Sequence, residues 1–115
     1  MRIEKVTFGA MIIDGQTYTS DLKIFPDGHI EDQWWRAEGH RLTMADIASL
    51  VAQRPALIIV GTGIYGRMNP ERELKAALAD RGIELVTAWT KAAGDRFNAA
   101  LETHSHLAAC FHLTC

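Results

Sequence analysis

Short apolar and polar alternations separated by turn residues occupy the first 42 positions and predict a β-rich N-terminal half. Asp14-Gly15 lies between runs at 10–13 and 16–18, and both residue types tolerate the positive φ angles of a two-residue hairpin turn. A second hairpin is predicted around Pro26-Asp27-Gly28, with strands over Leu22–Phe25 and Ile30–Trp35.

The remaining residues alternate strand-like apolar runs with helical spacing. We expect a helix opened by Thr43 and Asp46 as a capping box, and a later helix with Asn69 as N-cap and Pro70 in its first turn. Gly82 is placed to end that second helix, and Thr90 is expected to cap a third. The predicted strands of this half are Ala56–Val60, Ile83–Thr87 and Leu107–Leu113.

This order, a β-rich half followed by β-α-β-α-β, predicts an α/β fold with a buried central sheet and helices on its faces. The chain has 115 residues, which fits a single domain over 1–115. Apolar residues make up 48 % of it, so disorder is not expected. The N-terminal residues do not read as a signal or transit peptide, and no apolar run reaches the roughly 18 residues of a membrane span.

The charge balance gives a net charge of −2, which argues against a dedicated nucleic-acid-binding protein.

Cys110 and Cys115 would be separated by roughly 16 Å in an extended strand, at about 3.3 Å per residue. A disulfide needs less than about 7 Å, so we expect free thiols and a reducing, cytoplasmic location. Cys110 and His112 share a strand face, but no second ligand pair exists. We therefore expect no metal, and a His112 that is hydrogen-bonded in or near the core.

The loop after the first buried strand reads Gly61-Thr62-Gly63-Ile64-Tyr65-Gly66, which matches the dinucleotide-binding pattern G-x-G-x-x-G. In that motif the third glycine lies in the opening turn of the helix, whereas here the helix is expected to begin only at Asn69-Pro70. Placing Pro70 inside a helix would cost about 3 kcal/mol. We therefore expect no cofactor, although the backbone of Gly61–Gly63 could present N–H groups to a small anion.

Catalytic constellations are missing from the sequence. No serine lies in a nucleophile elbow, and there is no zinc-protease motif or phosphate-binding loop with its lysine. Asp21, Asp27 and Asp32 fall in or near turns, where carboxylates are usually solvated. An enzyme is therefore the less favoured interpretation.

A resemblance to a known family is carried by several segments. They are Trp35-Arg36 with Gly39, Leu57–Gly63, Arg81-Gly82-Ile83, then Thr90, Ala93 and Asn98, and the ending Phe111-His112-Leu113-Thr114-Cys115. The chain resembles the small α/β domain family first seen in an archaeal hypothetical protein. That family includes the adipogenesis-associated domain protein of animals and, more distantly, mitochondrial complex I assembly factor three. The resemblance implies a three-layer domain with a mixed central sheet and no established reaction.

The sequence thus favours a non-catalytic interaction or assembly-factor-like domain with a protein partner. The alternative is a protein that binds a small anion or nucleotide, or an enzyme, and that uses the Gly61–Gly66 loop. Both would use the carboxyl edge of the central strands. The expected surface consists of Gly61, Thr62 and Gly63, with Trp35, Arg36, Thr90 and Asn98 close by. Arg36 would add positive charge there, and Asn98 would brace the loop. The placement of Trp35 and Arg36 rests on the resemblance alone.

Overall fold

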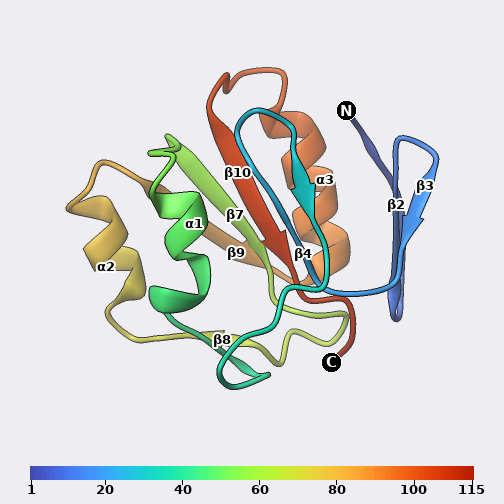
Figure 1. Ribbon diagram of the computed structural model, residues 1–115, viewed down its shortest axis with the longest axis horizontal. Helices are drawn as coiled ribbons and strands as arrows, with labels where there is room; N and C mark the ends of the chain where they lie inside the picture. The colour runs from blue at the N-terminus through green and yellow to red at the C-terminus, as the bar shows by residue number, and fades with distance from the viewer.

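A five-stranded mixed sheet forms the centre of the structure, a computed structural model that describes residues 1–115 (Figure 1). Its strands lie in the order β5-β4-β10-β7-β9. β10, β7 and β9 are parallel, whereas β4 is antiparallel to both β10 and β5. The bounds are Leu22–Ile24 for β4, Ile30–Glu31 for β5, Leu57–Gly61 for β7, Glu84–Ala88 for β9 and Leu107–Phe111 for β10.

Both faces of this sheet are covered, which is why β7 and β10 are apolar and buried at every position. One face packs against α1 and α2, and the other packs against α3 together with a three-stranded sheet, β1-β2-β3 (Figure 1). The prediction of a three-layer α/β domain with a β-α-β-α-β second half is therefore confirmed. The bounds are Ile3–Thr7 for β1, Ala10–Ile13 for β2, Gln16–Tyr18 for β3, Ala48–Val51 for α1, Leu74–Ala79 for α2 and Thr90–Ala100 for α3.

Three local turn signals act as predicted. Asp14 and Gly15 have φ angles of 49° and 80° and join β2 to β3. The side chains of Thr43 and Asp46 bond each other's backbone N–H group, at 3.4 and 2.8 Å, before the short 3-10 helix Ala45–Ile47 and α1. After α2, Gly82 adopts a φ of 75°, and the N–H groups of Gly82 and Ile83 bond back to the helix.

The helix start expected at Asn69-Pro70 is wrong. These two residues form a short strand, β8, parallel to β6 at Arg41–Leu42. The backbone N–H of Asn69 donates to the carbonyl of His40 at 2.9 Å, so a long-range strand contact overrides the local capping signal. α2 starts only at Leu74, after a turn.

The strand expected over Ile30–Trp35 is also too long. β5 ends at Glu31, and Gln33 turns the chain with a φ of 53°. Trp34 consequently enters the core, where it is 4 % exposed, and Trp35 points outward and is 75 % exposed. The turn at Gln33 therefore separates the two indoles.

Phe97 tests the packing of α3 on the sheet. Its ring is 1 % exposed and meets the ring of Phe111 edge-on, with 6.3 Å between centroids. We expect Phe97→Ala to lower the free energy of unfolding by about 3–5 kcal/mol, because the substitution leaves a cavity. Leu101→Ala, at the end of the same helix and 37 % exposed, is the matched control and should cost clearly less. Urea unfolding of both variants measures this, and equal losses would contradict the assigned packing.

Candidate functional site

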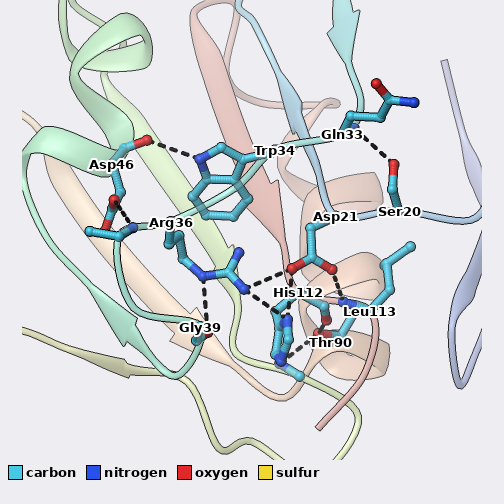
Figure 2. Close-up of polar contacts among 12 residues, drawn as sticks. Ser20, Asp21, Gln33, Trp34, Arg36, Gly39, Asp46, Thr90, His112 and Leu113 are labelled. Atoms are coloured by element: carbon cyan, nitrogen blue, oxygen red, sulfur yellow. Dashed lines mark hydrogen bonds and ion pairs between the residues drawn. The ribbon is translucent and has the colours of Figure 1, made fainter.

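A buried carboxylate, Asp21, organises the most polar part of the interior (Figure 2). It immediately precedes β4, and its Oδ2 atom accepts hydrogen bonds from Arg36 Nη2 at 2.8 Å and from His112 Nδ1 at 2.7 Å. Its Oδ1 atom accepts the backbone N–H of Leu113 at 2.7 Å. The expectation that Asp21 is a solvated turn residue is wrong, because three donors from distant segments replace water around it.

Arg36 is held inside the molecule and does not present its charge to solvent. Its side chain is 4 % exposed, and its Nε atom donates to the carbonyl of Gly39 at 3.0 Å. The guanidinium lies over the ring of Trp34, 4.7 Å from the centroid, and Trp34 Nε1 donates to the carbonyl of Asp46. The positive charge expected at a surface ligand is therefore neutralised internally by Asp21.

His112 lies just beyond β10, with its ring 7 % exposed. The expectation of a hydrogen-bonded histidine in or near the core matches this placement. The contact between Nδ1 and the carboxylate of Asp21 assigns the hydrogen to Nδ1, so a neutral ring carries a lone pair on Nε2. His112 Nε2 and Arg36 Nη1 are both buried without a hydrogen-bond partner.

This arrangement can orient a histidine as a proton acceptor, in the way a carboxylate does in acid–base catalysis. A substrate would also need a cleft that reaches Nε2. Neither Arg36 nor His112 lines any of the five main clefts of the molecule. No group of three or more His, Cys, Asp or Glu side chains could hold a metal ion. The hydrogen bonds among Asp21, Arg36 and His112 hold together the segments that carry them.

The electrostatics of Asp21 follow from its partners. Burial by itself raises the pKa of this carboxyl group. Hydrogen bonds from His112, from the Leu113 N–H and from Arg36 outweigh burial and hold the pKa below its usual value. Asp21 is therefore ionised in the folded protein at neutral pH.

Thr90 connects this network to the glycine loop. Its hydroxyl donates to the carbonyl of His112 at 2.6 Å and accepts the N–H of Gly63 at 2.9 Å. The expected N-cap role is wrong, because Trp89 precedes the helix and Thr90 is its first residue. The N–H of Thr90 donates to the carbonyl of Gly63 at 2.9 Å, so it is not free to bind a ligand.

The Gly61–Gly66 loop bonds most of its backbone N–H groups within the chain, and only that of Tyr65 has no partner there. The N–H groups of Thr62, Gly63, Ile64 and Gly66 all bond to carbonyl or hydroxyl groups of the chain. Since α2 begins eight residues after Gly66, no helix N-terminus follows the loop as it does in a dinucleotide site. The loop adopts the compact strand-to-helix connection that permissive glycine angles allow.

Three glycines of this loop are required by close approach, and at Gly61 a Cβ would lie 2.6 Å from the ring of Phe111. Gly63 has a φ of 114°, and a Cβ there would lie 2.5 Å from the backbone of Cys115 and 3.0 Å from His112 Cδ2. At Gly66 a Cβ would overlap the indole of Trp89, which lies directly against this backbone. The loop therefore forms a tight floor between the Asp21 network and the molecular surface.

Two residues expected in the cluster lie elsewhere. Asn98 accepts the N–H of Ile3 at 2.9 Å and donates to its carbonyl at 2.8 Å, so it braces β1 and not the loop. Trp35 lines a separate cleft with Lys23, Gln33 and Ser49. Arg36, Thr90 and Gly63 are brought together through His112.

Three exposed aromatic residues were missed by sequence reasoning. Phe8, Tyr65 and Trp89 are 56 %, 57 % and 59 % exposed. The rings of Phe8 and Tyr65 lie 6.0 Å apart, and Trp89 packs against Gly66, the residue after Tyr65. Phe8 and Tyr65 each adjoin a glycine in a turn, and that signal could have marked them as loop-tip residues. We name these three residues the aromatic surface.

Comparison with known protein families identifies the family of this chain. Residues 3–112 match the family described as protein of unknown function DUF498/DUF598. The chain belongs to this family. The resemblance to a small α/β family of unknown function is thereby confirmed. No curated protein matches the chain.

Solved structures agree with the fold of this DUF498/DUF598 domain. A conserved hypothetical protein, PH1505 from Pyrococcus horikoshii OT3, is 29 % identical with a TM-score of 0.82, and both chains are covered completely. A structure named MT938 is 20 % identical with a TM-score of 0.81, covering 99 % of this chain and 98 % of that one. A Bordetella pertussis protein described as an Mth938-like domain is 16 % identical with a TM-score of 0.68, covering 97 % of this chain and 85 % of that one. None of the helices in the domain is long and apolar enough to span a membrane.

The lowered pKa of Asp21 predicts a pH-dependent contribution to stability. Since the folded pKa lies below the unfolded value of about 3.9, the contribution is complete above that value and is lost as the pH falls through the folded pKa. In unfolding measurements from about pH 7 to pH 2, the wild type should exceed Asp21→Asn in stability at neutral pH, and the gap should narrow below about pH 4. Asp27→Asn, at an exposed turn, is the control and should show little change. A gap that stays constant with pH would contradict the ionised network.

Thr90→Val tests the link between the network and the loop. The valine keeps the volume but removes both hydrogen bonds at a fully buried position, leaving the Gly63 N–H without its partner. We expect a loss of about 1–3 kcal/mol in the free energy of unfolding. Thr103→Val, on the exposed end of the following turn, should change it by less than about 0.5 kcal/mol. Equal stability of Thr90→Val and wild type in urea would contradict the link.

Proposed function

We propose that this chain is a non-catalytic protein-interaction domain, of the assembly-factor-like kind that its resemblance implies. Its binding site is the aromatic surface, with Gly61, Thr62 and Gly63 as the floor beneath it. The observation that carries the proposal is that three half-exposed aromatic side chains from separate segments gather at the carboxyl edge of the central sheet. The domain acts without a cofactor and without nucleic acid, in the cytoplasm.

Aromatic side chains at this density suit a protein interface. Tyrosine, tryptophan and phenylalanine are enriched in interface cores, because they bury a large area and lose few rotamers on binding. Trp89 is already held against Gly66, and Phe8 is held against Tyr65. The surface is therefore ordered before a partner arrives, which lowers the entropic cost of association.

The charges around the aromatic surface indicate the chemistry of the partner. The segments 5–9, 64–68 and 88–92 carry Lys5, Arg67 and Lys91, all exposed, and no carboxylate residue. Because Lys5 and Lys91 line a cleft together with Glu4 and Asp95, a complementary protein surface would present apolar side chains within a rim of mixed charge. Such charges at the rim act mainly on the rate of encounter and on specificity.

The alternative, binding of a small anion or nucleotide by the Gly61–Gly66 loop, is supported less well. An anion site needs free N–H groups that converge on the ligand. The donors of Thr62, Gly63, Ile64 and Gly66 are already bonded within the chain. Arg36, the cation expected to assist, is engaged with Asp21.

The test compares Trp89→Ala and Tyr65→Ala with Trp35→Ala in affinity capture from the native host, read by mass spectrometry. Trp35→Ala is the matched control, because Trp35 is the most exposed tryptophan and lies outside the aromatic surface. We expect a specific partner to be retained by wild type and Trp35→Ala. Trp89→Ala should lower its affinity by about thirty-fold, which corresponds to an interface residue worth about 2 kcal/mol.

Capture that is unchanged by Trp89→Ala and Tyr65→Ala would remove the aromatic surface from the interaction. Loss of capture with Trp35→Ala alone would move the interface to the cleft beside Trp35. The melting temperature of each variant is measured in parallel, because a destabilised variant would lose capture for another reason.

A further inference from the structure

A second feature unused by the proposed function is the open edge of the central sheet. β9 is the last strand in the order β5-β4-β10-β7-β9 and pairs only with β7 (Figure 1). An edge strand presents a row of backbone donors and acceptors that another extended chain can pair with. Proteins usually cover or distort such an edge, but β9 runs for five residues in regular register with β7.

The backbone groups that face outward can be identified. The N–H of Glu84 and the carbonyl of Ala88 bond toward the β7 side, to Ala56 and Thr62. Because the direction of these groups alternates along a strand, the N–H and carbonyl groups of Leu85 and Thr87 point to the open edge. Two residues thus offer two donors and two acceptors at the spacing of a sheet ladder.

A groove follows this edge. One cleft of about 470 Å³ is lined by four consecutive strand residues, 84–87, and by side chains of the α2 and α3 regions, Arg72, Lys75 and Arg96 among them. A second cleft of about 290 Å³ continues it along Gly82, Ile83, Glu84 and Leu85. The groove therefore has an extended strand as its floor and helices as its walls.

The groove carries unpaired positive charge. Of its two carboxylates, Glu71 is engaged by Arg41 at 3.0 Å. No salt bridge is formed by three cationic side chains of the groove, Arg72, Lys75 and Arg96. Glu84 is its one remaining free carboxylate, so the groove has an excess of positive charge. This balance favours an occupant with acidic side chains.

We propose that the β9 edge binds an extended, acidic segment of a partner protein, which adds as a sixth strand to the central sheet. Backbone hydrogen bonds to Leu85 and Thr87 supply the affinity, and neighbouring acidic side chains, which point to opposite faces of the added strand, meet Arg72 and Lys75 on one wall and Arg96 on the other. This site uses main-chain groups and does not rest on the aromatic surface. A second copy of the chain fits less well, since pairing two β9 edges would bring six like charges together.

The probe is a capped ten-residue peptide with consecutive glutamates at its centre and valine or threonine on both sides, so that glutamates face both walls, and it is used at millimolar concentration. We expect its binding to slow hydrogen exchange at the Leu85 and Thr87 amides, as followed by NMR. A peptide with lysine at every glutamate position should leave these amides unchanged. Raising the salt concentration should weaken binding, because the walls act through charge.

Thr87→Pro isolates the backbone contribution. Proline removes an N–H that no other part of the chain uses and is tolerated on edge strands. It should weaken the acidic peptide at least tenfold, whereas Thr87→Val, which keeps the N–H, should not. If Thr87→Pro lowers the melting temperature, the double variant Arg72→Glu with Arg96→Glu replaces it and should abolish binding of the acidic peptide.

Trp89→Ala separates this site from the aromatic surface and should leave peptide binding unchanged. The proposal is overturned if the acidic peptide leaves the Leu85 and Thr87 amides unprotected, or if it binds equally to Thr87→Val and a folded Thr87→Pro. It is also overturned if light scattering shows a concentration-dependent dimer that Thr87→Pro dissociates, because the occupant would then be a second copy.

Discussion

The need to neutralise one buried carboxylate constrains how the two halves of this chain meet. An ionised Asp21 without partners would be strongly unfavourable in the interior. Its donors come from the segment after β5 and from the end of β10, which lies more than ninety residues away in the chain. The guanidinium of Arg36 is held by the carbonyl of Gly39 and by the ring of Trp34. The position of β4 beside β10 and the path of the chain around Arg36 are therefore linked through a single side chain.

The same network determines the character of the nearby surface. His112 is fixed by Asp21, and its carbonyl receives the hydroxyl of Thr90, which in turn binds Gly63. Each of these contacts is a hydrogen bond between buried groups. The glycine loop is therefore fixed by the interior of the protein beneath it. A loop with nearly all of its donors bonded within the chain has little to offer an anion, but its Gly66 supports the indole of Trp89. The polar interior thereby favours an apolar contact surface over a ligand pocket.

Local chemistry made much of the fold predictable, and long-range chemistry made the site difficult to predict. Gly82 ends α2 as expected, since its left-handed backbone needs only its neighbours. Asn69-Pro70 carried an equally good local signal but pairs with a strand far back in the chain. Asp21 resembles a solvated residue in sequence and Asn98 was expected to brace the glycine loop, because their partners lie 91 and 95 positions away. Residue type predicted which groups could bond, and only the folded topology determined which did.

The open edge and the aromatic surface adjoin, because Trp89 is the residue that follows β9. A partner strand that pairs with Leu85 and Thr87 needs about two more residues, at about 3.3 Å each, to reach the indole. Backbone pairing alone does not select the sequence of the partner segment. Aromatic contact alone does not fix the direction in which that segment runs. A segment that engages both is selected for sequence by the rings and for register by the strand. A partner that used both proposed sites would gain discrimination from their linkage, because its second contact would be intramolecular.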